Sequence, residues 1–151
     1  MLDAVVITGG EPTLQTGLAD FIKQIKKIGY LIKLDTNGLR PAELADLLKQ
    51  NLLDYVAMDI KAPIDRYQEL LPLSINSKLK IQNSKPQLKT QNCHNYKNNI
   101  KNSIKIIIQH SPDYEFRSTL IKGWHTENDF QQMTQMIHGA KKYFLQKFIP
   151  Q

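Results

Sequence analysis

The sequence of 151 residues contains a single cysteine, Cys93, and no long hydrophobic run. One cysteine excludes a framework of internal disulfides and is typical of a protein of the reducing cytoplasm. It also means that this chain cannot supply a multi-cysteine metal site from its own residues. No apolar run approaches the roughly 20 residues of a membrane-spanning helix, and Asp3 lies where a signal peptide would carry positive charge. We therefore expect a cytoplasmic protein without a membrane segment.

Acidic residues are missing from one long part of the chain. Between Leu70 and Pro112 there are seven lysines and no aspartate or glutamate, and these lysines account for the net charge of +6. Residues 74–103 also contain an imperfect tandem repeat, NSKLKIQ followed by NSKPQLKTQ. This composition is typical of a solvated low-complexity insertion. A lysine-rich RNA-binding arm is the alternative, but the segment lacks arginines and interleaved aromatic rings, so we expect no nucleic-acid partner.

Outside this insertion, strand and helix patterns alternate, which predicts βαβ units and a parallel sheet. The preferred fold is a closed or partly closed (β/α) barrel, and an open doubly wound sheet is the alternative. Residues 1–73 and 104–151 form the core of this prediction, and residues 100–109 fit either a helix or a strand. The expected strands are 4–8, 30–34, 55–60, 114–121 and 143–149, and the expected helices are 14–28, 41–48 and 130–137.

Polar residues follow several of these strands, and either fold would bring them to one edge of the sheet. Gly9 and Gly10 suit a tight turn, but they would also let a ligand approach the backbone. Glu11 beside them would add a negative charge for an ammonium group. Asp35 to Gly38 fit either a turn with a side-chain cap or part of a ligand site.

Three charged residues extend this set. Asp59 and Lys61 are two residues apart and so point to the same side of a strand, where they form either a simple ion pair or a ligand site. Arg117 is either a surface arginine or a fork for a carboxylate. The histidines show no metal-ligand spacing. These residues indicate a barrel enzyme for a small zwitterionic or phosphorylated ligand, and Lys61 could act as a Schiff-base nucleophile.

Three motifs carry a family resemblance: ITGGEPTLQ at 7–15, DTNG at 35–38 and MDIKAP at 58–63. In order and spacing they resemble the radical S-adenosylmethionine superfamily, and within it the activating enzymes of anaerobic ribonucleotide reductase and other glycyl-radical enzymes. The resemblance implies an α/β fold, namely a partial (β/α) barrel of the radical S-adenosylmethionine type. It also implies a glycyl-radical enzyme as protein substrate and an electron donor such as flavodoxin or ferredoxin.

The resemblance also implies roles for the strand-end residues. The GGEP motif would hold the methionine amino group of S-adenosylmethionine, and Arg117 would meet its carboxylate or ribose. In the activating enzymes a monovalent cation would lie among Asp35, Thr36 and Asp59. The expected ligand-binding residues are Gly9, Gly10, Glu11, Pro12, Thr36, Asn37, Asp59, Lys61 and Arg117.

The family reaction needs a [4Fe–4S] cluster held by three cysteines of a CxxxCxxC loop, which reduces S-adenosylmethionine to methionine and a 5′-deoxyadenosyl radical. This chain begins almost at the GGEP strand, so we expect it to lack the first βα unit and the cluster loop and to be inactive alone. The NCHN stretch at 92–95 resembles the end of such a cluster loop, and this interpretation treats that likeness as a coincidence. The alternatives are a non-catalytic remnant or subunit and a cluster-free barrel enzyme that uses Lys61. An incomplete barrel should also expose apolar surface on the strand Val5–Ile7.

Overall fold

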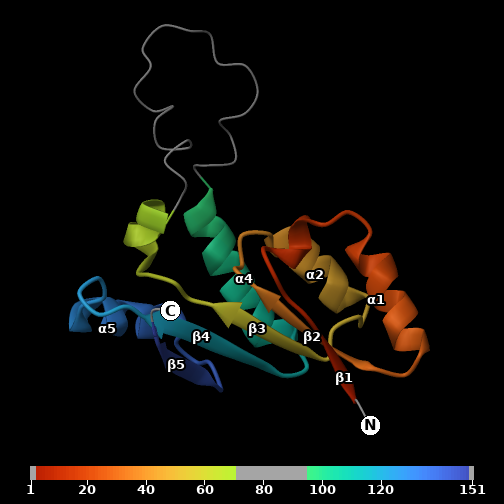
Figure 1. The fold of residues 1–151 in the computed structure, drawn as a ribbon. Coiled ribbons are helices and arrows are strands. Elements are labelled where there is room, and N and C mark those ends of the chain that lie inside the picture. The colour runs from red at the N-terminus through yellow and green to blue at the C-terminus, as the bar shows by residue number, and fades with distance from the viewer. Residues whose placement is uncertain (1–2, 71–94, 150–151) are drawn as a thin grey trace, which may run out of the picture.

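The computed structural model describes residues 3–70 and 95–149, which form one curved sheet with helices packed against it (Figure 1). Strands and helices alternate from β1 to β3 and again from α4 to β5. The elements in chain order are β1 (Ala4–Ile7), η1 (Pro12–Leu14), α1 (Leu18–Lys27), β2 (Leu31–Thr36), α2 (Pro41–Lys49), β3 (Tyr55–Asp59), η2 (Ile64–Leu70), α4 (Tyr96–His110), β4 (Tyr114–Leu120), α5 (Glu127–Met136) and β5 (Tyr143–Lys147).

The five strands are all parallel and lie in the order in which they occur in the chain. A doubly wound sheet reverses its strand order at a switch point, whereas a (β/α) barrel adds each strand beside the previous one. The observed order therefore confirms the preferred α/β fold of the barrel type. Within the described residues β1 and β5 each pair on one side only, so the sheet is a partial barrel.

Burial alternates along the central strands and so defines two faces of the sheet. On one face Ile32, Leu34, Val56, Met58 and Phe116 have no exposed surface, because the helices cover them. The residues between them on β2 and β4 are only partly buried. We call this second side the inner face, since it is the concave interior side of a barrel. The apolar core therefore lies between the sheet and its helices, and the inner face is left for polar side chains.

The region after β1 differs from the expected single helix over residues 14–28. A short 3-10 helix, η1, begins at Pro12, and α1 begins only at Leu18. Between them the chain turns at Gly17, whose φ of +84° lies in the left-handed region. A right-handed helix cannot continue through that conformation, so the helix prediction was wrong at its first turn.

Helix α4 resolves the ambiguity at residues 100–109, which are helical. It begins at Tyr96, so the predicted boundary between an insertion ending at 103 and a core beginning at 104 falls inside a helix. Ile100 and Ile104 share its buried face with Ser103, and this packing explains why the helix starts earlier. The rest of the expected insertion, including Cys93, lies outside the described residues. None of the described helices is long and apolar enough to cross a membrane.

Candidate functional site

The carboxylate of Glu11 ties the end of β1 to the end of β2. Its Oε1 accepts hydrogen bonds from Thr13 N (3.2 Å), Thr13 Oγ1 (2.5 Å) and Thr36 Oγ1 (2.9 Å), and its Oε2 accepts from Asn37 N (2.6 Å). Glu11 is only 7% exposed, and these four donors offset the cost of burying its charge. Pro12, buried beside it, starts η1 and fixes the direction of the chain. The GGEP and DTNG motifs are thereby joined in one structure.

The two glycines before Glu11 leave their backbone open. Gly9 and Gly10 have φ values of +93° and +53°, which residues with a Cβ adopt only with strain. A Cβ added to either residue would meet nothing within 4 Å. Conformation therefore requires glycine here, and the open space beside the backbone leaves room for a ligand at the C-terminal end of β1.

Arg117 joins three strands on the inner face. From β4 its Nε and Nη2 donate to Asp59 Oδ1 on β3 at 3.1 and 3.0 Å. Its Nη1 donates to Asp35 Oδ2 on β2 at 3.1 Å. Although partial burial acts in the opposite direction, the charges of Asp59 and Asp35 raise the pKa of Arg117 above its ordinary value. The predicted residues Asp35, Asp59 and Arg117 are therefore neighbours.

Below this level, closer to the N-terminal ends of the strands, Glu115 is held by two further residues. Lys33 Nζ donates to its Oε1 at 3.0 Å, and Tyr55 OH donates to its Oε2 at 2.9 Å. Burial acts the other way, but these two hydrogen bonds hold the pKa of Glu115 below its ordinary value. Glu115 Oε1 also lies 3.9 Å from Arg117 Nη1, so the two levels form one electrostatic network.

The network is balanced in charge and leaves one oxygen unpaired. Three carboxylates face three basic side chains, and the last pair is Lys61 Nζ with Asp59 Oδ2 at 3.1 Å. The buried Asp35 Oδ1 has no hydrogen-bond partner among the residues that the structure describes. A buried acceptor without a donor is costly, so this oxygen is available to a bound donor or cation. The six residues are Lys33, Asp35, Asp59, Lys61, Glu115 and Arg117.

The backbone of Lys61 is fixed from both sides. Its N–H donates to Tyr67 OH at 3.1 Å, and its carbonyl oxygen lies 3.1 Å from His125 Nε2. The other ring nitrogen of His125, Nδ1, accepts from Ile121 N at 3.0 Å, so Nε2 carries the proton and donates to Lys61 O. The loops after β3 and β4 are thus linked, which sets the position from which the Lys61 side chain extends.

The side chains of Thr36 and Asn37 form hydrogen bonds within the turn that follows β2. The side chain of Thr36 is on the opposite face of β2 from Asp35, where its hydroxyl bonds to Glu11 and accepts from Gly38 N at 3.1 Å. Asn37 Oδ1 accepts from Leu39 N at 2.9 Å. The side chains of both residues organise the turn, and the Thr36 hydroxyl is not beside Asp35 and Asp59.

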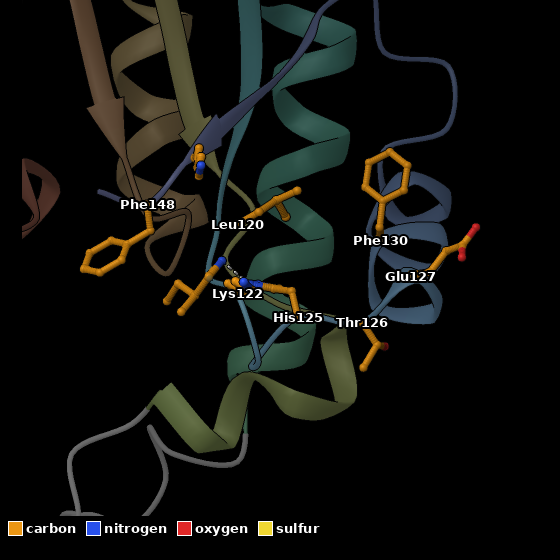
Figure 2. A pocket seen from close by; sticks show the side chains of 9 residues that line it. Leu120, Lys122, His125, Thr126, Glu127, Phe130 and Phe148 are labelled. Carbon is orange, nitrogen blue, oxygen red and sulfur yellow. Dashed lines mark hydrogen bonds between the residues drawn. The ribbon is translucent and has the colours of Figure 1, made fainter. Parts of the chain in front are cut away.

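A separate pocket of about 430 Å³ lies at the C-terminal ends of β4 and β5 (Figure 2). Leu120, Phe130 and Phe148 contribute apolar walls, and Lys122 and Lys147 are among its polar residues. It shares no residue with the charged network. The pocket is therefore a separate, mainly apolar hollow at the C-terminal edge of the sheet.

The described residues do not fit an iron–sulfur cluster. No group of three or more histidine, cysteine, aspartate or glutamate side chains within residues 3–70 and 95–149 is arranged to hold a metal ion. The whole chain has one cysteine, whereas an iron–sulfur cluster is held by several thiolates. No reaction step through a cluster can therefore be derived from these residues.

Sequence reasoning missed Lys33, Tyr55 and Glu115. A signal for them was present, because Lys33 and Asp35, and likewise Glu115 and Arg117, are charged residues two apart that alternate with apolar residues. Such a period of two places both members on one face of a sheet. Polar residues repeated on the same face of neighbouring strands would have identified the lower level of the network.

Comparison with known proteins agrees with this fold. A family model described as the radical SAM superfamily matches residues 1–137. The chain belongs to that superfamily.

Two curated relatives indicate a narrower similarity. The chain is 30% identical over 149 residues to a protein of Methanocaldococcus jannaschii provisionally named a glycyl-radical enzyme activating enzyme. That match covers 98% of this chain and 55% of the relative, so the chain spans about half the length of that relative. It is also 43% identical over 58 residues to a 7-carboxy-7-deazaguanine synthase of Neisseria meningitidis, covering 38% of this chain and 24% of that protein.

Solved structures are similar in fold. A structure of TYW1 with a bound lysine–pyruvate adduct matches with a TM-score of 0.64 at 21% identity, over 98% of this chain and 42% of that one. A domain of pyruvate-formate lyase-activating enzyme from Bacteroides vulgatus matches with a TM-score of 0.58 at 18% identity, over 93% of this chain and 74% of that one. Both support the partial (β/α) barrel.

Proposed function

We propose that this chain is the S-adenosylmethionine-binding part of a radical enzyme that activates a glycyl-radical enzyme. The observation that carries the proposal is the balanced charge network on the inner face of the sheet, with Asp35 Oδ1 unpaired among the described residues. A site with equal numbers of acids and bases suits a ligand group that carries both charges. The amino-acid end of S-adenosylmethionine is such a zwitterion.

The residues of this chain would bind and orient the ligand. The open backbone of Gly9 and Gly10 would accept hydrogen bonds from the ligand ammonium group. Glu11 Oε2, which accepts only Asn37 N among the described donors, retains acceptor capacity for the same group. Arg117 and Lys61 would meet the carboxylate or ribose. S-adenosylmethionine, when reduced, supplies the group that abstracts hydrogen. The cysteines that hold the reducing cluster would come from outside this chain.

Asp35 Oδ1 and Asp59 could instead hold a monovalent cation, as expected for the activating enzymes. Thr36 would then contribute its backbone carbonyl, because its hydroxyl is engaged with Glu11. The alternative of a Schiff-base enzyme receives less support. Lys61 Nζ is ion-paired with Asp59, and its side chain is 49% exposed, so nothing around it favours a covalent nucleophile.

Calorimetric titration of the chain with S-adenosylmethionine tests the proposal. We expect binding, and we expect Arg117→Gln to weaken it about tenfold or more, because a charge-assisted hydrogen bond to the ligand is lost. Asp20→Asn, at an exposed helical position far from the network in sequence, is the control and should bind like the unchanged chain. Absence of binding, or equal binding by the Arg117 variant, would contradict the proposal.

The same proposal predicts that the isolated chain does not cleave S-adenosylmethionine, even after anaerobic incubation with iron, sulfide and a reductant. Formation of methionine and 5′-deoxyadenosine would show that it does. Sequencing the gene upstream of the Met1 codon provides the complementary test. An in-frame CxxxCxxC segment would make this chain part of an active enzyme, whereas a stop codon without such a segment would favour the non-catalytic alternative.

A further inference from the structure

Arg117 reaches across an entire strand to contact Asp35. Arg117 is on β4 and Asp35 on β2, and β3 lies between them. Alternate strands of a sheet are about 10 Å apart, so the two side chains can meet only by extending toward each other over β3. The path begins at the level of Asp59, the register partner of Arg117, and ends at the level of Ala57, the register partner of Asp35. Ala57 is therefore the residue of β3 that lies at the Asp35 end of the path.

Ala57 is completely buried, although the helices of the described residues pack against the other face of the sheet (Figure 1). Its neighbours on the inner face remain partly exposed, with side-chain exposures of 17% for Asp35, 14% for Glu115 and 20% for Arg117. These longer side chains therefore cover the Ala57 methyl group. A branched or longer residue at position 57 would occupy the space through which the guanidinium of Arg117 passes.

Glu115, which precedes Arg117 by two residues on β4, limits the movement of the Arg117 side chain over β3. Its carboxylate is fixed by Lys33 and Tyr55, and its Oε1 lies 3.9 Å from the Nη1 that donates to Asp35. Arg117 Nε and Nη2 are both held by Asp59 Oδ1, and the guanidinium is rigid and planar, so a displacement of the group also displaces Nη1 from Asp35. The guanidinium therefore has one orientation in which all three contacts form.

We propose that Ala57 is a positioning residue of the ligand site: its small side chain keeps open the passage over β3 through which Arg117 reaches Asp35, and the braced Glu115 holds Arg117 in that passage. The inference rests on the proposed function only in what the positioned Arg117 binds. The dependence of the Arg117–Asp35 contact on the size of residue 57 does not require that a ligand is bound.

The first experiment measures the Arg117–Asp35 coupling by a double-mutant cycle of Asp35→Asn and Arg117→Gln in urea unfolding, without ligand. We expect a favourable coupling in the Ala57 background and its loss in the Ala57→Leu background. Ala57→Val is the second variant, in case Ala57→Leu does not fold. Ala57→Gly, which leaves the passage open, should retain the coupling. Val6→Leu adds the same kind of bulk to the inner face on β1, and it should also retain the coupling. Equal coupling with Ala57 and with the larger residue overturns the inference.

The second experiment compares the affinities for S-adenosylmethionine and 5′-methylthioadenosine, which lacks the amino-acid group. We expect Ala57→Leu to weaken binding of S-adenosylmethionine about tenfold, as for a lost charge-assisted hydrogen bond, and to change binding of 5′-methylthioadenosine less than about twofold. An equal loss for both ligands indicates general damage and contradicts positioning. If the unchanged chain binds neither ligand, the proposed function fails, while the coupling experiment still decides the inference.

Discussion

Glu11 and Asp129 are buried carboxylates, and each is stabilised by the hydrogen-bond donors that surround it in the fold. Glu11 accepts bonds from Thr13, Thr36 and Asn37 at the ends of two strands. Asp129 accepts from Thr126 N, Thr126 Oγ1 and Arg66 Nη1 at 2.8, 2.8 and 2.6 Å. The Thr126 bonds complete a capping box at the start of α5. Both acids thus use buried charge to fix the start of a helical segment.

The Asp129 contacts predict how stability depends on pH. The hydrogen bond from Thr126 N–H, followed by those from the Thr126 hydroxyl and Arg66, lowers the pKa of Asp129 to about 2. The contribution of a carboxyl with a lowered pKa is complete above its unfolded pKa of about 3.9 and is lost as the pH falls through its folded value. We therefore expect the unfolding free energy of the unchanged protein to exceed that of Asp129→Asn by a constant amount above about pH 5, and this difference to shrink toward pH 2.

Urea unfolding at a series of pH values measures this difference. Asp20→Asn is the matched control, because the Asp20 side chain is 79% exposed and its contact with Lys23 spans 3.5 Å. Its difference from the unchanged protein should vary little with pH. A stability difference for Asp129→Asn that stays level from pH 5 to pH 2 would show that the capping contacts do not determine the ionisation of Asp129.

At the scale of elements, the turn between β2 and α2 is packed against the core. Gly38 has a φ of +75°, and a Cβ built on it would lie 2.1 Å from Met58 Cε. Gly38 O also accepts from the buried Ser103 hydroxyl of α4 at 2.8 Å. The glycine of the DTNG motif therefore joins β2, β3 and α4, and it lies directly after the candidate site.

Gly38→Ala should destabilise the protein more than Gly123→Ala. Gly123 has a similar φ of +82°, but a Cβ added there meets nothing within 4 Å. Both variants have a strained backbone, which costs about 1 kcal/mol, and only Gly38→Ala must also displace the buried Met58 side chain. We expect an additional loss of about 1–2 kcal/mol, as for other overpacked sites. Thermal or urea unfolding of the two variants measures it, and equal losses would mean that Met58 moves aside freely.

Most strands and helices could be predicted because the spacing of apolar and β-branched residues along the sequence differs between the two kinds of element. It could not predict how side chains meet between strands, since the register of β2, β3 and β4 depends on packing of the whole sheet. Asp35, Asp59 and Arg117 were expected at one edge, but the passage over Ala57 and the brace at Glu115 depend on that register. The engagement of Thr36 with Glu11 was likewise not evident from the order of the motifs.

At the scale of the whole molecule, the sheet has two edges at which, within the described residues, no further strand pairs. Large apolar side chains are exposed on the elements that form both edges. Val6 on β1 is 51% exposed, which agrees with the expected apolar surface on this strand. At the other edge, Phe144 and Leu145 on β5 are 49% and 47% exposed. Exposed edges and apolar surface favour association.

We therefore expect the isolated chain to self-associate as its concentration rises. Replacing Val6 on β1 and Leu145 on β5 by lysine should shift it toward the monomer, because charge on an edge strand opposes pairing. Size-exclusion chromatography with light scattering measures this mass. Gln24→Lys together with Gln15→Lys introduces the same charge at exposed polar positions and should not have the same effect. A monomer at all concentrations in the unchanged chain would contradict the prediction.

The sequential order of the strands has a consequence for synthesis. Each strand pairs only with the strands before and after it, so the sheet can grow as the chain leaves the ribosome, with no strand waiting for a distant one. β1, β2 and β3 are complete at Asp59, whereas β4 begins only at Tyr114. Loop-closure entropy rises with the length of a connection, so this addition costs more than the earlier ones. During translation of that stretch we therefore expect a three-stranded nascent sheet that contains the GGEP and DTNG motifs but not Arg117, so the candidate site is completed only when β4 is added.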